Sequence, residues 1–189
     1  KLDYRINPLK GYMAEFTGSV GNKTITKNPD LDEALYSNLS LNSLQYKLYA
    51  RLSKFFPTGK RTTFMTRIYS GYLVNDQVFM NELFRIGGLK TLRGFDEEGM
   101  NASLFGIATA EFRFLLERNS ALFVFADYAY YERTIQEEHF SDRPYGFGGG
   151  INFQTKAGIF SVNYALGAEN RNPIQLRGGK VHIGFVNYF

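Results

Sequence analysis

Apolar and polar side chains alternate with a period of two along most of the chain, as in β-strands that have one apolar face. In the segment 45–56, one side carries Tyr46, Leu48, Ala50 and Leu52, and the other carries Gln45, Lys47, Arg51 and Ser53. The same pattern predicts eight strands, at residues 11–20, 45–56, 61–73, 103–116, 121–131, 145–154, 158–167 and 180–189. We therefore expect an all-β, antiparallel fold.

The links between these strands alternate in length. Short links fall at residues 57–60, 117–120 and 155–157, and long polar links fall at 21–44, 74–102, 132–144 and 168–179. Tight turns at one end and long loops at the other are typical of bacterial outer-membrane barrels, in which the short turns face the periplasm. Alternation alone would also suit a β-sandwich whose apolar face points inward, so the link lengths carry the prediction of a transmembrane β-barrel.

The composition agrees with this prediction. The chain has 18 Phe, 13 Tyr and 19 Gly but no Trp and no Cys, and its mean hydropathy is −0.27. Such values are expected when one strand face meets lipid and the other meets water. No run approaches the ~20 apolar residues of a spanning helix. Because the chain begins at Lys1, without Met or a leader, we expect a processed form or a fragment of a longer protein.

Residues that could carry catalysis or bind a metal are scarce. His139 lies in an expected loop beside Glu137 and Glu138, and His182 lies on the last strand without an acidic neighbour in sequence. A metal site needs more ligands than this, and the absence of Cys removes thiolate ligands. The net charge of +4 is spread among acidic residues, which argues against nucleic acid as a partner. We expect no catalytic residue, no metal, no cofactor and no enzymatic activity.

The most informative link is the loop 74–102, which contains Gly87-Gly88 and then Leu92, Arg93, Gly94 and Phe95. Glycines allow backbone conformations that are closed to other residues, so the loop can turn tightly and present Arg93 as a planar fork of five donors. Such a fork needs acceptors. Taken alone, however, this short motif is more typical of an exposed loop with a solvated arginine.

The order of the segments around this loop carries a resemblance. The motif is followed by Ala110–Phe114, then by Phe123–Asp127, then by Gly146–Ile151, and finally by a strand that ends on an aromatic residue. Over residues 8–189 the chain resembles the BamA-type superfamily of outer-membrane barrels. That superfamily includes the barrel-assembly insertase, the TamA-type translocation proteins, the two-partner secretion transporters and barrels fused to a patatin lipase.

The resemblance implies a sixteen-stranded barrel, with residues 1–189 as one domain that supplies eight strands of its second half. The loop with Leu92, Arg93, Gly94 and Phe95 would tuck into the lumen and pair its arginine with Asp127. Strand alternation places Asp127 on the inward face with Phe123, Phe125 and Ala129. The family often has Gly at the position of Ala129. Glu111 also faces inward and is a second candidate acceptor.

The resemblance further implies a terminal recognition signal on the last strand, formed here by His182, Gly184, Tyr188 and Phe189. Asn187 departs from this signal, because the family usually has an apolar or aromatic residue there. The seam between the first and last strands of the barrel would be weakly closed, so residues 180–189 would border a lateral opening. We expect the segments 11–20 and 180–189 to be separate edges.

The implied function is the insertion or export of other proteins in the bacterial outer membrane, without chemistry. The implied partners are outer-membrane lipid, unfolded outer-membrane or secreted client proteins, and periplasmic or lipoprotein accessory subunits. Alternatives are a two-partner secretion transporter, a patatin-fused lipase barrel, and a self-contained eight-stranded structural or adhesive barrel. In each of these barrels we expect the lipid-facing residues to include Tyr46, Leu48, Phe112, Phe114, Val124, Phe160, Val162 and Tyr164.

Overall fold

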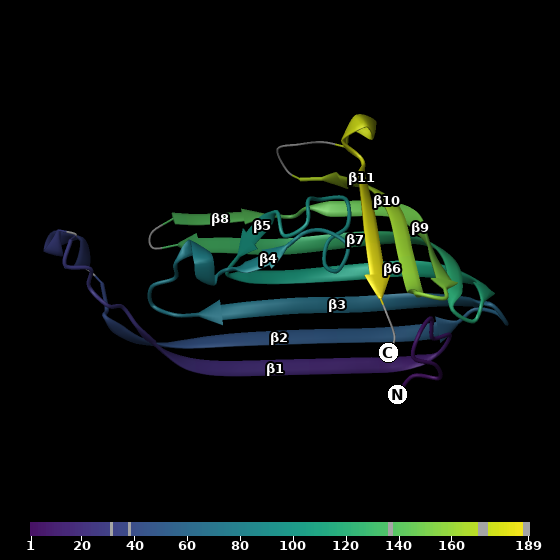
Figure 1. Cartoon of the computed structure of the whole chain (residues 1–189), viewed down its shortest axis with the longest axis horizontal. Helices are drawn as coiled ribbons and strands as arrows, with labels where there is room; N and C mark the ends of the chain where they lie inside the picture. Colours follow the sequence, from purple (N-terminus) through teal and green to yellow (C-terminus); the bar gives the residue numbers. More distant parts are fainter. Residues whose placement is uncertain (31, 38, 136–137, 170–173, 187–189) are drawn as a thin grey trace.

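A computed structural model describes residues 1–30, 32–37, 39–135, 138–169 and 174–186. The chain forms one strongly curved antiparallel sheet (Figure 1), with the strand order β1-β2-β3-β6-β7-β9-β10-β11. These strands are β1 (Gly11–Thr24), β2 (Asn42–Pro57), β3 (Thr62–Val74), β6 (Leu104–Glu117), β7 (Ser120–Ile135), β9 (Tyr145–Thr155), β10 (Gly158–Ala168) and β11 (Lys180–Val186). They correspond to the eight strands expected, so the all-β antiparallel prediction is confirmed.

Helical structure in the described ranges is limited to three short 3-10 turns. They are η1 (Glu33–Tyr36), η2 (Met80–Glu82) and η3 (Leu176–Gly178). Within those ranges, no helix has the length and apolar content needed to cross a membrane.

The two outer strands of the sheet remain open. β1 pairs with β2 alone and β11 pairs with β10 alone, and in the described part of the chain no pairing joins β1 to β11. The described residues of the two edges are therefore unpaired with each other, and their separation in the intact protein stays a prediction. A self-contained eight-stranded barrel would have required the two strands to be hydrogen-bonded to each other.

The long links are shorter than expected, because the strands continue into them. β7 runs to Ile135 and pairs with β8 (Glu138–Asp142), so the segment 132–144 is mainly a hairpin and His139 lies on a strand. Here Arg133 lies over the ring of Phe140, 5.4 Å from its centroid. The loop prediction was wrong because charged residues on both faces hide the alternation that marks a strand. Likewise, β1 extends to Thr24 and β2 begins at Asn42.

The link 74–102 is also not a simple loop. It contains η2 and a small second sheet formed by β4 (Phe84–Ile86) and β5 (Met100–Ala102). Phe84 packs edge-to-face on Phe105 of β6 and on Tyr49 of β2, with ring centroids 5.4 and 4.9 Å apart. The resulting apolar core consists of Leu73, Val78, Leu83, Phe84, Ile86, Leu92, Ala102, Phe105, Ile107, Ala129 and Tyr131. The link therefore packs against the concave face of the main sheet.

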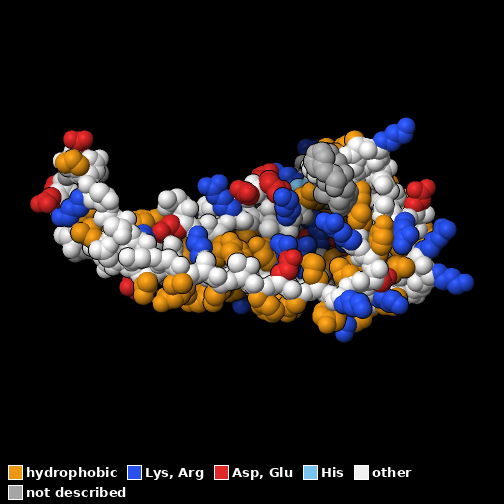
Figure 2. Space-filling view, turned by 60° about the horizontal axis from the view of Figure 1, so that its bottom comes forward, with side chains coloured by type: hydrophobic (Ala, Val, Ile, Leu, Met, Phe, Trp, Pro, Cys, Tyr) orange, Lys and Arg blue, Asp and Glu red, His pale blue; other side chains and the backbone are white. Residues whose placement is uncertain are grey.

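The outward face of the sheet is apolar. Of the residues expected there, the exposed ones are Tyr46, Leu48, Phe112, Phe114, Val124 and Tyr164. Phe160 and Val162 are half-buried, and Phe160 contacts the rings of Phe153 and Phe185 at centroid distances of 5.6 and 4.7 Å. Figure 2 shows apolar side chains gathered along the lower border of the molecule, with charged side chains above them. Contact of this face with lipid stays a prediction.

Candidate functional site

Arg93 is buried against the concave face of the sheet and its guanidinium contacts two carboxylates. Its Nε donates to Asp127 Oδ2 at 2.7 Å, its Nη2 donates to Asp127 Oδ1 at 2.8 Å, and its Nη1 donates to Glu111 Oε2 at 2.6 Å. The backbone N–H of Arg93 also donates to Asp127 Oδ2, at 3.2 Å. All three side chains are at most 6% exposed. The structure thus brings Arg93 together with both acceptors that the sequence indicated.

One row of cross-strand neighbours on the concave face lies beneath this contact. The row consists of Arg67, Thr109, Asp127, Gly146 and Gly167. Thr109 Oγ1 donates to Asp127 Oδ1 at 2.7 Å, and Arg67 Nη2 donates to Thr109 Oγ1 at 3.2 Å. Asp127 is therefore oriented by its neighbour on β6 as well as by Arg93.

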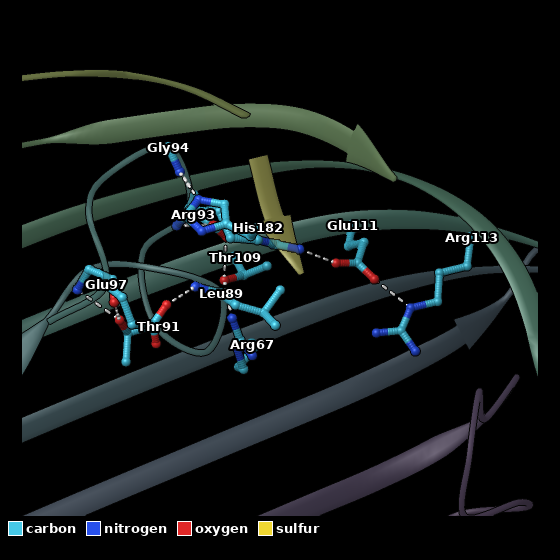
Figure 3. A network of polar contacts seen from close by, with 12 residues as sticks. Arg67, Leu89, Thr91, Arg93, Gly94, Glu97, Thr109, Glu111, Arg113 and His182 are labelled. Atoms are coloured by element: carbon cyan, nitrogen blue, oxygen red, sulfur yellow. Dashed lines mark hydrogen bonds and ion pairs between the residues drawn. The ribbon is translucent and has the colours of Figure 1, made fainter. Parts of the chain in front are cut away.

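Glu111 joins the motif arginine to a second arginine. Its Oε2 accepts from Arg93 and its Oε1 accepts from Arg113 Nε, as Figure 3 shows. The guanidinium of Arg93 also lies over the ring of Phe125, 3.4 Å from its centroid, which is a cation–π geometry. Burial alone would lower the pKa of Arg93, but the hydrogen bonds and charges of Asp127 and Glu111 outweigh it and raise the pKa. The arginine therefore stays charged.

The loop before Arg93 is a folded turn. Gly87 and Gly88 have φ angles of +111° and +89°, in the region that favours glycine. Thr91 Oγ1 accepts from the Gly87 N–H and donates to the Gly87 carbonyl, both at 2.8 Å. The Gly88 N–H donates to the Leu92 carbonyl at 2.9 Å, and the Leu89 N–H donates to Glu97 Oε2 at 2.9 Å. These contacts hold the turn in the shape that presents Arg93.

Two glycines of the sheet make room for the backbone of the motif. A Cβ at Gly146 would lie 2.0 Å from the Arg93 carbonyl oxygen, and one at Gly167 would lie 2.5 Å from the Gly94 carbonyl oxygen. Gly94 itself has a φ of +96° and lies against the backbone of Leu166. The motif therefore fits directly onto β9 and β10, where any larger side chain would displace it.

The motif loop also contacts the edge strand β11. The Gly94 N–H donates to His182 Nε2 at 3.2 Å, and Lys180 Nζ forms an ion pair with Asp96 Oδ1 at 2.6 Å. A Cβ at Gly184 would lie 2.5 Å from Leu89 Cδ2. Two residues that the sequence assigned to a terminal signal, His182 and Gly184, thus lie against the loop.

The remaining sequence-predicted residues separate into two groups. Leu92 is fully buried in the apolar core, and the ring of Phe95 lies where a Cβ on Gly167 would approach it to 2.9 Å. Tyr188, Phe189 and the departing Asn187 lie outside the described residues, so the terminal signal stays a prediction there.

Sequence reasoning missed Thr109, Arg113, Phe125 and Arg67 as parts of this network. Each lies on the inward face of its strand, which is the side of the sheet that Asp127 and Glu111 occupy. Alternation could have placed them on the right face. It could not have shown which of the inward side chains contact Arg93, because that depends on the register between strands.

The arrangement is a charged clamp, because the carboxylates of Asp127 and Glu111 both accept hydrogen bonds from arginine side chains. Across the described ranges, no three His, Cys, Asp or Glu side chains gather as a metal site would require. What the contacts do is hold the loop 87–99 in one position across β6, β7, β9, β10 and β11 (Figure 3).

A strongly curved antiparallel sheet with an apolar outward face and a folded loop on its concave face is the architecture expected of part of a transmembrane β-barrel. A profile of the Omp85 superfamily domain matches residues 1–184, so the chain belongs to the Omp85 superfamily. Its β-barrels act in the assembly or transport of outer-membrane proteins, in bacteria or in the equivalent membranes of organelles. The resemblance to BamA-type barrels is thereby confirmed. A comparison with curated proteins gave no match.

Proposed function

We propose that this chain supplies one half of a sixteen-stranded barrel that inserts or exports other proteins in the bacterial outer membrane. The observation that carries the proposal is the edge of β11, which pairs with β10 on one side and with no described strand on the other. An open edge presents unpaired backbone N–H and C=O groups. Addition of a strand to such an edge is a common way of binding an extended polypeptide.

The contents of the concave face support a barrel of more than eight strands. An eight-stranded barrel has an interior that is just filled by its own side chains. Here the concave face already packs against β4, β5 and the motif loop, with Ile86 and Leu92 at most 1% exposed. Additional strands are therefore needed to enclose these segments.

The spacing of outward aromatic residues supports membrane insertion. On β2, Tyr46 and Phe56 lie ten residues apart, and on β3, Phe64 and Tyr72 lie eight residues apart. Eight to ten residues span roughly 26–33 Å along a strand, and a tilt of about 40° reduces this to about 20–25 Å across the bilayer. Outer-membrane barrels have an apolar band about 25 Å tall between two aromatic girdles.

In this proposal the motif loop supports the open edge. Arg93 fixes the loop to β6 and β7, and the loop in turn contacts β11 through His182 and Lys180. β11 is thus held at a defined position although its outer edge is unpaired. Client strands, outer-membrane lipid and accessory subunits are the proposed partners.

Cysteine cross-linking tests this proposal, because the chain has no Cys of its own. Ile183→Cys places one thiol on the outward face of β11, and Val124→Cys places a matched thiol on β7, which is paired on both sides. With an unfolded outer-membrane protein carrying a Cys in its final strand, we expect a disulfide only with Ile183→Cys. Equal cross-linking at both positions, or cross-linking at Val124→Cys alone, would contradict edge addition.

A further inference from the structure

The end of the sheet that carries the short turns is strongly basic. Residues 1–12, 54–62, 117–120 and 154–158 contain eight Lys or Arg and two acidic residues. The links at the other end, residues 25–41, 75–102, 132–144 and 169–180, contain nine basic and thirteen acidic residues. In Figure 2 most of the charged side chains at the turn end, on the right, are blue. We use the name turn-end collar for the exposed residues Lys10, Lys54, Lys60, Arg61, Arg118 and Lys156.

The collar charges are not neutralised within the described part of the chain. There, none of the six side chains forms an ion pair with a carboxylate. Asp3, one of the two acidic residues at this end, accepts instead from the backbone N–H groups of Leu9 and Lys10, at 3.1 and 3.2 Å. Several cations thus share one rim with few counter-charges, which favours an external anionic partner.

Lys54 indicates what kind of partner this is. Strand alternation places it on the outward face of β2, between Leu52 and Phe56, which are 41% and 40% exposed. Its Nζ lies over the Phe56 ring, 5.0 Å from the centroid, so the ammonium points toward the turn end. A lysine on an apolar outward face normally extends its charge to the lipid headgroups in this way. A soluble protein docked below the barrel would not reach this position.

We propose that the turn-end collar binds the phosphate groups of anionic phospholipids in the leaflet next to the turns. The proposal rests on the membrane placement argued above and adds a lipid preference to it. Each of the described short turns contributes at least one cation: Lys60 and Arg61 between β2 and β3, Arg118 between β6 and β7, and Lys156 between β9 and β10. Clusters of basic residues at a membrane surface attract anionic lipid, and the attraction is screened by salt.

The test measures lipid selectivity of the intact protein in phosphatidylcholine vesicles, by electron paramagnetic resonance of a spin-labelled lipid. The probes are spin-labelled phosphatidylglycerol and phosphatidylcholine, which differ in charge. We expect the anionic probe to be preferred by about threefold or more at low salt, since each basic residue near the surface adds attraction. The preference is expected to decrease as NaCl increases.

Two matched variants locate the effect. The collar variant carries Lys54→Gln, Lys60→Gln, Arg61→Gln and Lys156→Gln, and is expected to bind both probes nearly equally. The loop-end variant carries Lys27→Gln, Arg85→Gln, Lys90→Gln and Arg143→Gln, and is expected to keep the preference. The proposal is overturned if the collar variant retains the full preference, or if the loop-end variant loses as much.

Two further outcomes are distinguishable. If neither probe shows a motionally restricted population, the protein is not in the bilayer and the membrane placement itself fails. If the protein is inserted without an anionic preference, but a decaglutamate peptide binds it in detergent through the same four residues, the collar is a protein-docking surface and the lipid proposal is overturned.

Discussion

Both carboxylate oxygens of Asp127 accept from the guanidinium of Arg93, at 2.7 Å from Nε and 2.8 Å from Nη2. The two residues are 34 positions apart; one lies in the loop and the other on β7. A bidentate arginine–carboxylate pair fixes orientation as well as distance. The pair therefore determines where the loop lies on the concave face.

Removing the charge of Asp127 should destabilise the fold more than removing that of Glu111. Breaking a dry, buried pair costs about 3–5 kcal/mol, and we expect Asp127→Asn to approach this range. Glu111→Gln should cost less, because Arg93 keeps its two bonds to Asp127 and Arg113 is 17% exposed. Urea unfolding in lipid vesicles, followed by circular dichroism, measures both free energies of unfolding. A larger loss for Glu111→Gln would contradict this ranking.

The fit of the motif onto β9 predicts that Gly146→Ala displaces the loop. The added Cβ would lie 2.0 Å from a backbone oxygen of Arg93, and overpacking of this kind costs about 1–3 kcal/mol. Gly106→Ala is a matched control, because its Cβ would meet no atom within 4 Å. Protease cleavage after Lys90 should become faster in the first variant and stay unchanged in the second. Similar cleavage rates in both would show that the close approach has no effect.

The contact between His182 and the loop should depend on pH. His182 Nε2 accepts the Gly94 N–H, which requires the neutral imidazole. Because a histidine ordinarily titrates near pH ~6.5, this contribution is present at higher pH and is lost as the ring becomes protonated. A fluorophore on Lys90→Cys should report greater loop mobility at acidic than at neutral pH. A His182→Gln variant keeps an acceptor that does not titrate, so an equal pH response there would contradict the assignment.

If the outward face contacts lipid, the loss of stability caused by a charge on this face should depend on its position along the strand. Val124 is 59% exposed on β7, and Val124→Arg should cost about 2–4 kcal/mol, as charges near the middle of a bilayer do. Thr134→Arg lies on the same face of the same strand but beyond the apolar segment, and should cost about 0–1 kcal/mol. Unfolding in lipid vesicles measures the difference. Equal costs would argue that this face does not contact lipid.

Strand alternation divided the residues of each strand between two faces, and the alternating link lengths indicated that the apolar face points outward. Asp127 and Glu111 were expected to point inward and Val124 outward, because a period of two allows only two sides. The sequence did not predict that Gly146 and Gly167 leave space for the backbone of Arg93 and Gly94. Their importance depends on where the loop backbone lies, which involves residues more than fifty positions away in the sequence.

The hairpin of β7 and β8 and the contacts of β11 were missed for different reasons. Residues 132–142 have charged side chains on both faces, so no apolar periodicity marks them as strands. His182 was interpreted through its place near the end of the chain, whereas the structure pairs it with Gly94 of the loop. Contacts of this kind follow from tertiary packing and have no local signal.

The distance between β1 and β11 in the folded, intact protein tests the half-barrel account most directly. Spin labels on Phe16→Cys and Ile183→Cys report it by pulsed electron paramagnetic resonance, without interference from native Cys. Sixteen tilted strands spaced about 4.8 Å apart form a barrel roughly 30 Å across, and β1 and β11 should lie nearly opposite each other. We predict a label separation of about 30 Å or more; a value near 10 Å, as for neighbouring strands roughly 5 Å apart with flexible labels, would contradict the account.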